Sequence, residues 1–201
     1  MEKAGVAPEL TERWRRLAFT WGAPREAVDA IGVDVVARYA EPHRRYHTLD
    51  HVAEVLAVVD ELGGSVEVEW AAWLHDVIYD VRAADSEARS AGYAGDVLAR
   101  LHVPDDVISE VQRLIELSAT HTVVAGDKNG AVFVEADLAI LTSDPARYDR
   151  YARDVRDEYA HIDDDAWREG RATVLRSLLQ RVTDERARSN LTRELAALSV
   201  P

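Results

Sequence analysis

The stretch of residues 71–80 constrains the fold most, because it is apolar on every side except for one histidine-aspartate doublet. A helix that is apolar all round is buried inside a protein. His75 and Asp76 therefore need partners, since an unpaired buried charge is very costly. A divalent metal ion accepts a neutral imidazole nitrogen and a carboxylate oxygen together. The run predicts a buried helix that carries two metal ligands.

The composition restricts which residues could complete such a site. The 201-residue chain has no cysteine, which excludes disulfides, zinc-thiolate sites, iron-sulfur clusters and a cysteine nucleophile. Further ligands must come from histidine, aspartate and glutamate. The net charge of −13 argues against binding to a nucleic-acid polymer, which needs a basic face. A metal and a few arginines could still attract a small anion locally.

Length and hydropathy predict one domain over residues 1–201. No apolar run approaches the roughly 20 residues of a membrane span, and the first residues lack the apolar core of a signal peptide. We therefore expect a cytoplasmic protein with no membrane partner. A homodimer is left open, because a dimer face and an ordinary solvated helix share the same pattern.

The predicted fold class is all-α, because apolar residues recur with the helical period and no parallel-sheet alternation is found. The predicted helices cover two stretches within residues 9–41 with a break near residues 22–24, then residues 49–62, 66 through the doublet, 85–102, 104 to about 121, 131–141, 145–162 and 165–198.

Three more polar residues fall on apolar helical faces. His51 shares a row with valines and a leucine, so it lies on the buried side of its helix. Asp137 interrupts the apolar run 131–141, and His121 ends the inward row of the helix before it. The doublet, His51 and Asp137 together offer two nitrogens and two carboxylates. That set suits a divalent ion such as Mn, Fe, Mg, Co, Ni or Zn, with positions left for water and substrate.

The order His51, His75-Asp76, Asp137 resembles the H…HD…D pattern of the HD superfamily of metal-dependent phosphohydrolases. Residues 46–51 also resemble the YHN-x-x-H motif of cyclic nucleotide phosphodiesterases. Residues 41–51, 74–80, 85–91 and 135–141 are similar to signatures of a small bacterial subfamily of predicted HD phosphohydrolases. The resemblance covers most of residues 38–180. It implies a single-domain HD-type helical bundle with the metal site in the core cleft, and N- and C-terminal helices packed on it.

The resemblance also implies roles for individual residues. His51, His75, Asp76 and Asp137 would be the metal ligands, and a water activated by the metal would hydrolyse a small phosphate ester such as a nucleotide. His47 falls where the phosphodiesterases keep a general acid, and Asp76 is counted with it as catalytic. A four-residue spacing from His51 would place His47 on the same side of a helical turn. Arg44 or Arg45 would hold a phosphate oxygen.

Other interpretations of these residues stay open. Instead of acting as an acid, His47 could donate a hydrogen bond to one of the metal ligands. His121 could be a ligand to a second metal or a histidine that stabilises a helix end through the dipole. For His43 the simpler interpretation is packing before the helix. At the level of function, the alternatives are a dinuclear iron oxygenase on the same fold and a non-catalytic module that binds metal or nucleotide.

Overall fold

The computed structural model describes residues 6–199 and confirms the predicted fold class, since these residues contain ten α-helices, two short 3₁₀ helices and no strand. None of these helices is long and apolar enough to cross a membrane. The chain divides into two compact units, residues 1–137 and residues 138–201. The prediction of one domain over 1–201 stays a prediction. Every predicted site residue lies in the first unit.

The first unit opens with two helices separated by a tight turn, as predicted. α1 (Val6–Ala18) is followed by η1 (Phe19–Trp21) and α2 (Arg25–Tyr39). Gly22 ends η1 in the left-handed region at φ 71°, a conformation that favours glycine. The indole of Trp14 donates a hydrogen bond to the carbonyl of Val28, which ties α1 to α2.

The next two helices lead to the histidine-aspartate doublet. α3 (Leu49–Glu61) is followed by its C-cap Leu62 and by Gly63. α4 (Val66–Leu74) has Ser65 as its N-cap, and the Ser65 hydroxyl accepts a hydrogen bond from the amide of Val68. The expectation that the helix continues to residue 80 is wrong, because α4 ends at Leu74 and residues 75–80 form turns. Side chains take over the backbone hydrogen bonds there: the Ser90 hydroxyl accepts from the amide of Ile78 and donates to its carbonyl.

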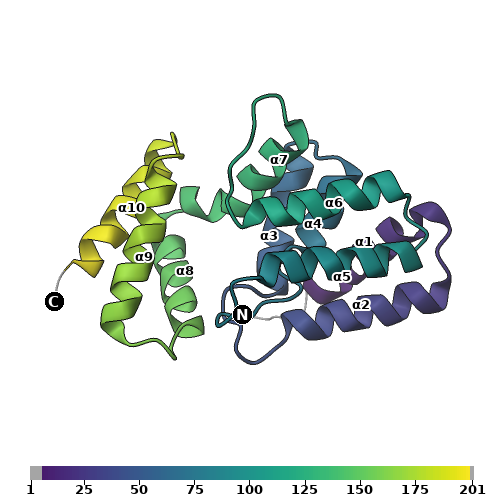
Figure 1. The fold of residues 1–201 in the computed structure, drawn as a ribbon, viewed down its shortest axis with the longest axis horizontal. Coiled ribbons are helices and arrows are strands. Elements are labelled where there is room, and N and C mark those ends of the chain that lie inside the picture. Colours follow the sequence, from purple (N-terminus) through teal and green to yellow (C-terminus); the bar gives the residue numbers. More distant parts are fainter. Residues whose placement is uncertain (1–5, 200–201) are drawn as a thin grey trace. The chain divides into compact units, whose positions relative to one another are not determined.

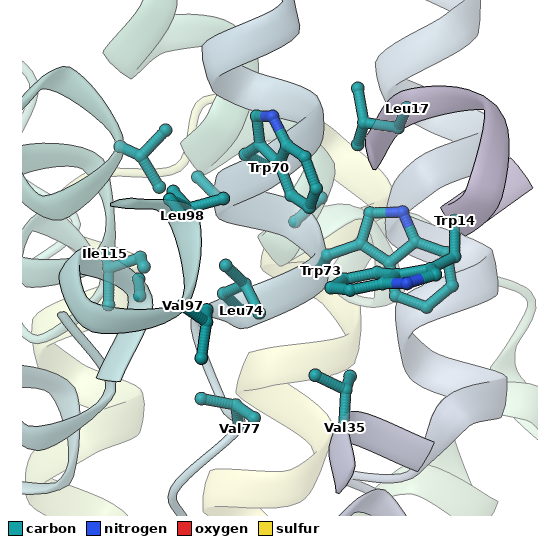
Figure 2. Close-up of a cluster of buried hydrophobic side chains, with 14 of the residues drawn as sticks. Trp14, Leu17, Val35, Trp70, Trp73, Leu74, Val77, Val97, Leu98 and Ile115 are labelled. Carbon is teal, nitrogen blue, oxygen red and sulfur yellow. The ribbon is translucent and has the colours of Figure 1, made fainter. Parts of the chain in front are cut away.

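α4 is the centre of the first unit and contacts α3, α5, α6 and α7. α5 (Ser86–Arg100) and α6 (Asp105–Ser118) lie side by side, and α7 (Lys128–Asp137) packs on α3, α4 and α6 (Figure 1). Figure 2 shows side chains of α4 between those of α1 and those of α5 and α6. Trp14 meets Trp70 and Trp73 edge to face, with ring centroids 5.3 and 5.5 Å apart. The burial predicted for this run is confirmed for residues 71–75 and for Val77, whereas residues 76, 78 and 79 are partly exposed and Asp80 is exposed.

The second unit contains η2 (Leu138–Thr142), α8 (Pro145–Glu158), α9 (Asp164–Leu179) and α10 (Glu185–Leu198). The stretch 165–198 is therefore two helices, and the second begins at Asp184, whose carboxylate caps the amide of Ala187. A buried pair between Arg171 and Glu194, 2.7 Å apart, joins α9 to α10.

Candidate metal centre

His51 lies in the first turn of α3 with 4% of its surface exposed. Its place on the buried side of the helix follows from the helical period, and the structure confirms it. The residue after it, Val52, is fully buried, so the local sequence holds the start of α3 against the core. The imidazole of His51 is thereby held inside the protein with its Nε2 atom toward the doublet.

His75 caps the C-terminal end of α4 and is 2% exposed. Its Nδ1 atom lies 3.2 Å from the carbonyl oxygen of Ala72. A carbonyl only accepts hydrogen bonds, so Nδ1 carries the proton in this contact. The lone pair of a neutral His75 is therefore on Nε2, the atom that faces His51.

Asp137 is the last residue of α7, and its two carboxylate oxygens face different partners. Oδ1 lies 3.3 Å from Nε2 of His51 and 3.4 Å from Nε2 of His75. Oδ2 accepts a hydrogen bond of 2.9 Å from Nε2 of His121. Oδ1 thus lies close to the Nε2 atoms of both histidines, and Oδ2 is held by the hydrogen bond from His121.

The ligand atoms of His51, His75 and Asp137 fit a metal ion. They all lie within 4.8 Å of one another, and the two imidazole Nε2 atoms are 3.3 Å apart. A point equidistant from these three atoms lies about 1.9 Å from each, close to the roughly 2.0–2.2 Å of metal bonds to histidine and carboxylate. The donor types match as well, since imidazole and carboxylate together suit a borderline or hard divalent ion. This buried group could therefore hold a metal ion.

Asp76 lies beside this group. Its Oδ2 atom is 3.1 Å from Nε2 of His75 and 3.9 Å from Nε2 of His51. Its side chain is 18% exposed, against 10% for Asp137, so it has more contact with solvent than the other carboxylate. The four residues predicted as ligands are brought together, three of them in one tight cluster and Asp76 at its more exposed side.

Charges at the site stabilise one another against the cost of burial. Burial lowers the pKa of His75, but the carboxylates of Asp76 and Asp137 outweigh it and raise that pKa well above its usual value. Burial raises the pKa of Asp137, yet His75 and the hydrogen bond from His121 hold it well below its usual value. The pKa of Asp76 is likewise lowered despite burial, first by His75 and then by His47. A cation at this point, a proton on His75 or a metal ion, balances the buried negative charge.

His47 lies in a turn before α3, so the predicted position on a shared helical turn is wrong. It is nevertheless next to the cluster, with its ring centroid 5.8 Å from that of His51. Two aromatic rings flank it: Tyr46 at 5.0 Å and Tyr79 at 4.3 Å. His43 is exposed and bonds through Nε2 to the carbonyl of Tyr79, which agrees with the packing interpretation.

The two arginines before α3 have different surroundings. Arg44 is 3% exposed, and its guanidinium bonds to Glu41 and to the backbone carbonyls of His47, Asp76 and Val77. Four N–H groups of Arg44 are thus engaged inside the protein, and the contact of Arg44 or Arg45 with a phosphate oxygen stays a prediction. Arg45 is exposed, and its guanidinium donates to the carbonyls of Pro42 and Arg44.

His121 follows α6 rather than ending it, and it has a left-handed backbone at φ 51°. The predicted approach of this histidine to the site is confirmed by its bond to Asp137. The cluster that could hold a metal within residues 6–199 consists of the other three residues, so a second metal on His121 stays a prediction.

Two residues that support the doublet had no predicted role. Ser90 is fully buried and holds Ile78, and Tyr39 donates from its hydroxyl to the carbonyl of Trp73. Ser90 belongs to the segment 85–91 that resembles a family signature, so a signal for it was present. Tyr39 looks like an ordinary core residue of α2 and carries no such signal.

Comparisons of the chain with protein-family models, with curated proteins and with solved structures found no match.

Proposed function

We propose that this protein is a metal-dependent phosphohydrolase that acts on a small phosphate ester such as a nucleotide. The observation that carries the proposal is the convergence of His51, His75 and Asp137 on one point at metal-bond distance, with Asp76 beside it. The resemblance of residues 41–51, 74–80 and 135–141 to HD phosphohydrolase motifs supports the same chemistry.

In this proposal, each residue of the site has a separate role. His51, His75 and Asp137 hold a divalent ion, and Asp76 completes the protein ligands. When bound, such an ion lowers the pKa of water and offsets negative charge on a phosphoryl group. His47 is half-buried beside His51 and donates the proton that the leaving oxygen needs. Arg45, the exposed arginine, binds a phosphate oxygen through its guanidinium.

The first test is elemental analysis of the untagged protein beside a His75→Ala, Asp76→Ala double variant. We expect about one divalent ion per wild-type chain and none in the double variant. A His161→Ala variant, which changes an exposed histidine of the second unit, is the control and should keep the ion. Protein that binds no ion after reconstitution with Mn, Fe, Co or Zn would refute the proposal.

The second test is turnover. A panel of nucleotides and sugar phosphates is assayed for phosphate release with each bound metal. His47→Ala should keep its metal and lose about 100-fold or more in kcat on the best substrate. Full turnover in His47→Ala would refute the acid role. Saturable nucleotide binding with no turnover for any metal would favour the non-catalytic module.

The dinuclear iron oxygenase is the second candidate, favoured by the bond between His121 and Asp137, which brings a third histidine to the site. It requires two irons per chain and substrate loss that depends on oxygen. A single ion per chain would exclude it.

A further inference from the structure

Among the arginines and lysines of the first unit that the structure describes, Arg44 is the buried one, and its side chain has no exposed surface. Its Nη1 atom donates to two carbonyls, that of Asp76 at 2.7 Å and that of His47 at 3.1 Å. Nη2 donates to the carbonyl of Val77 at 3.3 Å, and Nε to the Glu41 carboxylate at 3.1 Å. Four of its five N–H groups thus have partners within the protein.

These contacts join two segments that lie about 30 residues apart in the sequence. One is the turn that leads into α3 and carries His47, and the other is the turn that follows α4 and carries Asp76. The carbonyls concerned lie outside the helices, so no helical amide is available to them. A single nitrogen of Arg44 therefore fixes the backbone of both residues at once.

We infer that Arg44 is a positioning residue that sets His47 and Asp76 relative to each other, and that it does not bind substrate. The inference rests on the proposed function for the roles of those two residues. Because both residues lie in turns, no helix fixes their separation. A displacement of about 1 Å in a catalytic group can lower the rate by about 100-fold.

The surroundings of the guanidinium explain why an arginine is required. Its central carbon lies 5.0 Å from the ring centroid of Tyr39 and 5.3 Å from that of Tyr79. A planar guanidinium packs against aromatic rings and still donates in several directions from its edge. Lysine offers one ammonium on a flexible stem and cannot reach the carbonyls of both segments with the same geometry.

The second turn and the end of α4 are also held by hydrogen bonds in which Arg44 takes no part. Ser90 binds both backbone groups of Ile78, and the Tyr39 hydroxyl donates to the carbonyl of Trp73 in α4. The turn after α4 would therefore keep its general course in an Arg44 variant. The change would be confined to the distance between the two turns, which makes the inference testable in a folded protein.

The first experiment needs neither metal nor substrate. Amide hydrogen exchange is compared in metal-free wild type, Arg44→Lys and Arg44→Met. The matched control is Arg13→Met, which removes another partly buried arginine of the same unit that bonds to Asp60 and Glu69. We expect exchange about tenfold faster at residues 46–48 and 76–79 together in the Arg44 variants, and unchanged in the control. Wild-type protection of both segments in Arg44→Lys would overturn the inference. Should Arg44→Met fail to fold, Arg44→Lys decides alone.

The second experiment separates positioning from substrate binding. In the protein loaded with Co²⁺, the visible spectrum should change in Arg44→Lys in the same direction as in Asp76→Asn, and stay constant in Arg13→Met. Turnover of Arg44→Lys should show kcat about 100-fold lower with KM within about threefold of wild type. A raised KM with unchanged kcat would mean that Arg44 binds the phosphate. If wild type binds no Co²⁺, the proposed function fails, whereas the exchange experiment still decides the role of Arg44.

Discussion

His102 and His121 form a natural matched pair, because they are the two described non-glycine residues with positive φ. His102 has φ 60° at the end of α5 and is exposed. His121 has φ 51° after α6 and donates to Oδ2 of Asp137 at 2.9 Å. Replacing each with glycine relieves the same backbone strain but removes a site contact only at His121.

The expected free energies follow from these two terms. Glycine keeps the left-handed backbone without the steric cost of a Cβ, which gains about 1 kcal/mol, and the freer unfolded chain of a glycine variant takes back about 0.5–1 kcal/mol. His102→Gly should therefore change the free energy of unfolding by less than about 0.5 kcal/mol. A hydrogen bond to an ionised group contributes about 1.5–3 kcal/mol, and we take the low end because the His121 side chain is 22% exposed. His121→Gly should be about 1–1.5 kcal/mol less stable than His102→Gly.

The assay is urea denaturation of both metal-free variants in a Trp167→Phe background, followed by the fluorescence of the remaining tryptophans, which all lie in the first unit. The metal affinity of both variants is also measured by titration. Removing a residue that is hydrogen-bonded to a metal ligand typically weakens metal binding by about 10–100-fold. His102→Gly should bind metal as wild type does. Equal stability and equal metal affinity of the two variants would refute the reasoning, because the contact between His121 and Asp137 would then contribute nothing.

Three further predictions concern the same unit. A Cβ on Gly130 would lie 2.3 Å from Oδ2 of Asp127, so Gly130→Ala should lose about 1–2 kcal/mol in thermal unfolding, whereas Gly92→Ala, with open space around it, should gain up to about 1 kcal/mol. Hydrogen bonds from Arg113 hold the pKa of Asp127 below its usual value. Its charge therefore stabilises the fold above the unfolded pKa of about 3.9, and that stability is lost as pH falls through the lower folded pKa. Asp127→Asn should cost about 1 kcal/mol at pH 7 and less as pH falls below the unfolded pKa in urea titrations, and an equal loss at every pH would exclude the charge as its cause. The pKa of His75 is raised by its two carboxylate neighbours despite burial, so metal binding at pH 7 should release about one proton, measured by calorimetry in two buffers. No proton release would mean that His75 is already neutral.

The sequence was sufficient for the all-α class and for the buried side of the helices that carry the key residues, but not for helix ends, since the stretch 165–198 is two helices and α7 ends at Asp137. The helical period placed His51 on the inner side of its helix, and the structure gives it 4% exposure. The same reasoning placed Asp137 in a buried helix rather than a strand, which is also confirmed. Local pattern is enough in these cases because a helix of fixed pitch decides which side a residue faces.

The helical period could not predict the turns around the site, because the hydrogen bonds that hold these turns come from residues distant in the sequence. No residue near Leu74 in the sequence signals the end of α4. The backbone hydrogen bonds of a longer helix are replaced by contacts from Ser90 and Arg44, 12 or more residues away. For the same reason, the sequence could not distinguish Arg44 from Arg45 as the residue that would hold a phosphate oxygen. The sequence around an arginine next to a motif is the same whether its guanidinium faces solvent or bonds to the backbone of another turn. Only the tertiary structure distinguishes the two.

The three clustered donors are spread over residues 51–137 of the first unit, and this distribution affects the stability of the protein. An ion held by them would connect the start of α3, the end of α4 and the end of α7, segments up to 86 residues apart. The unfolded chain has no such arrangement of donors. At a free metal concentration 100 times the dissociation constant, occupancy would add about 2.7 kcal/mol to stability. Opening of the fold and exposure to proteases would then be about 100-fold rarer in loaded chains than in empty ones. The supply of metal would then affect the amount of this protein.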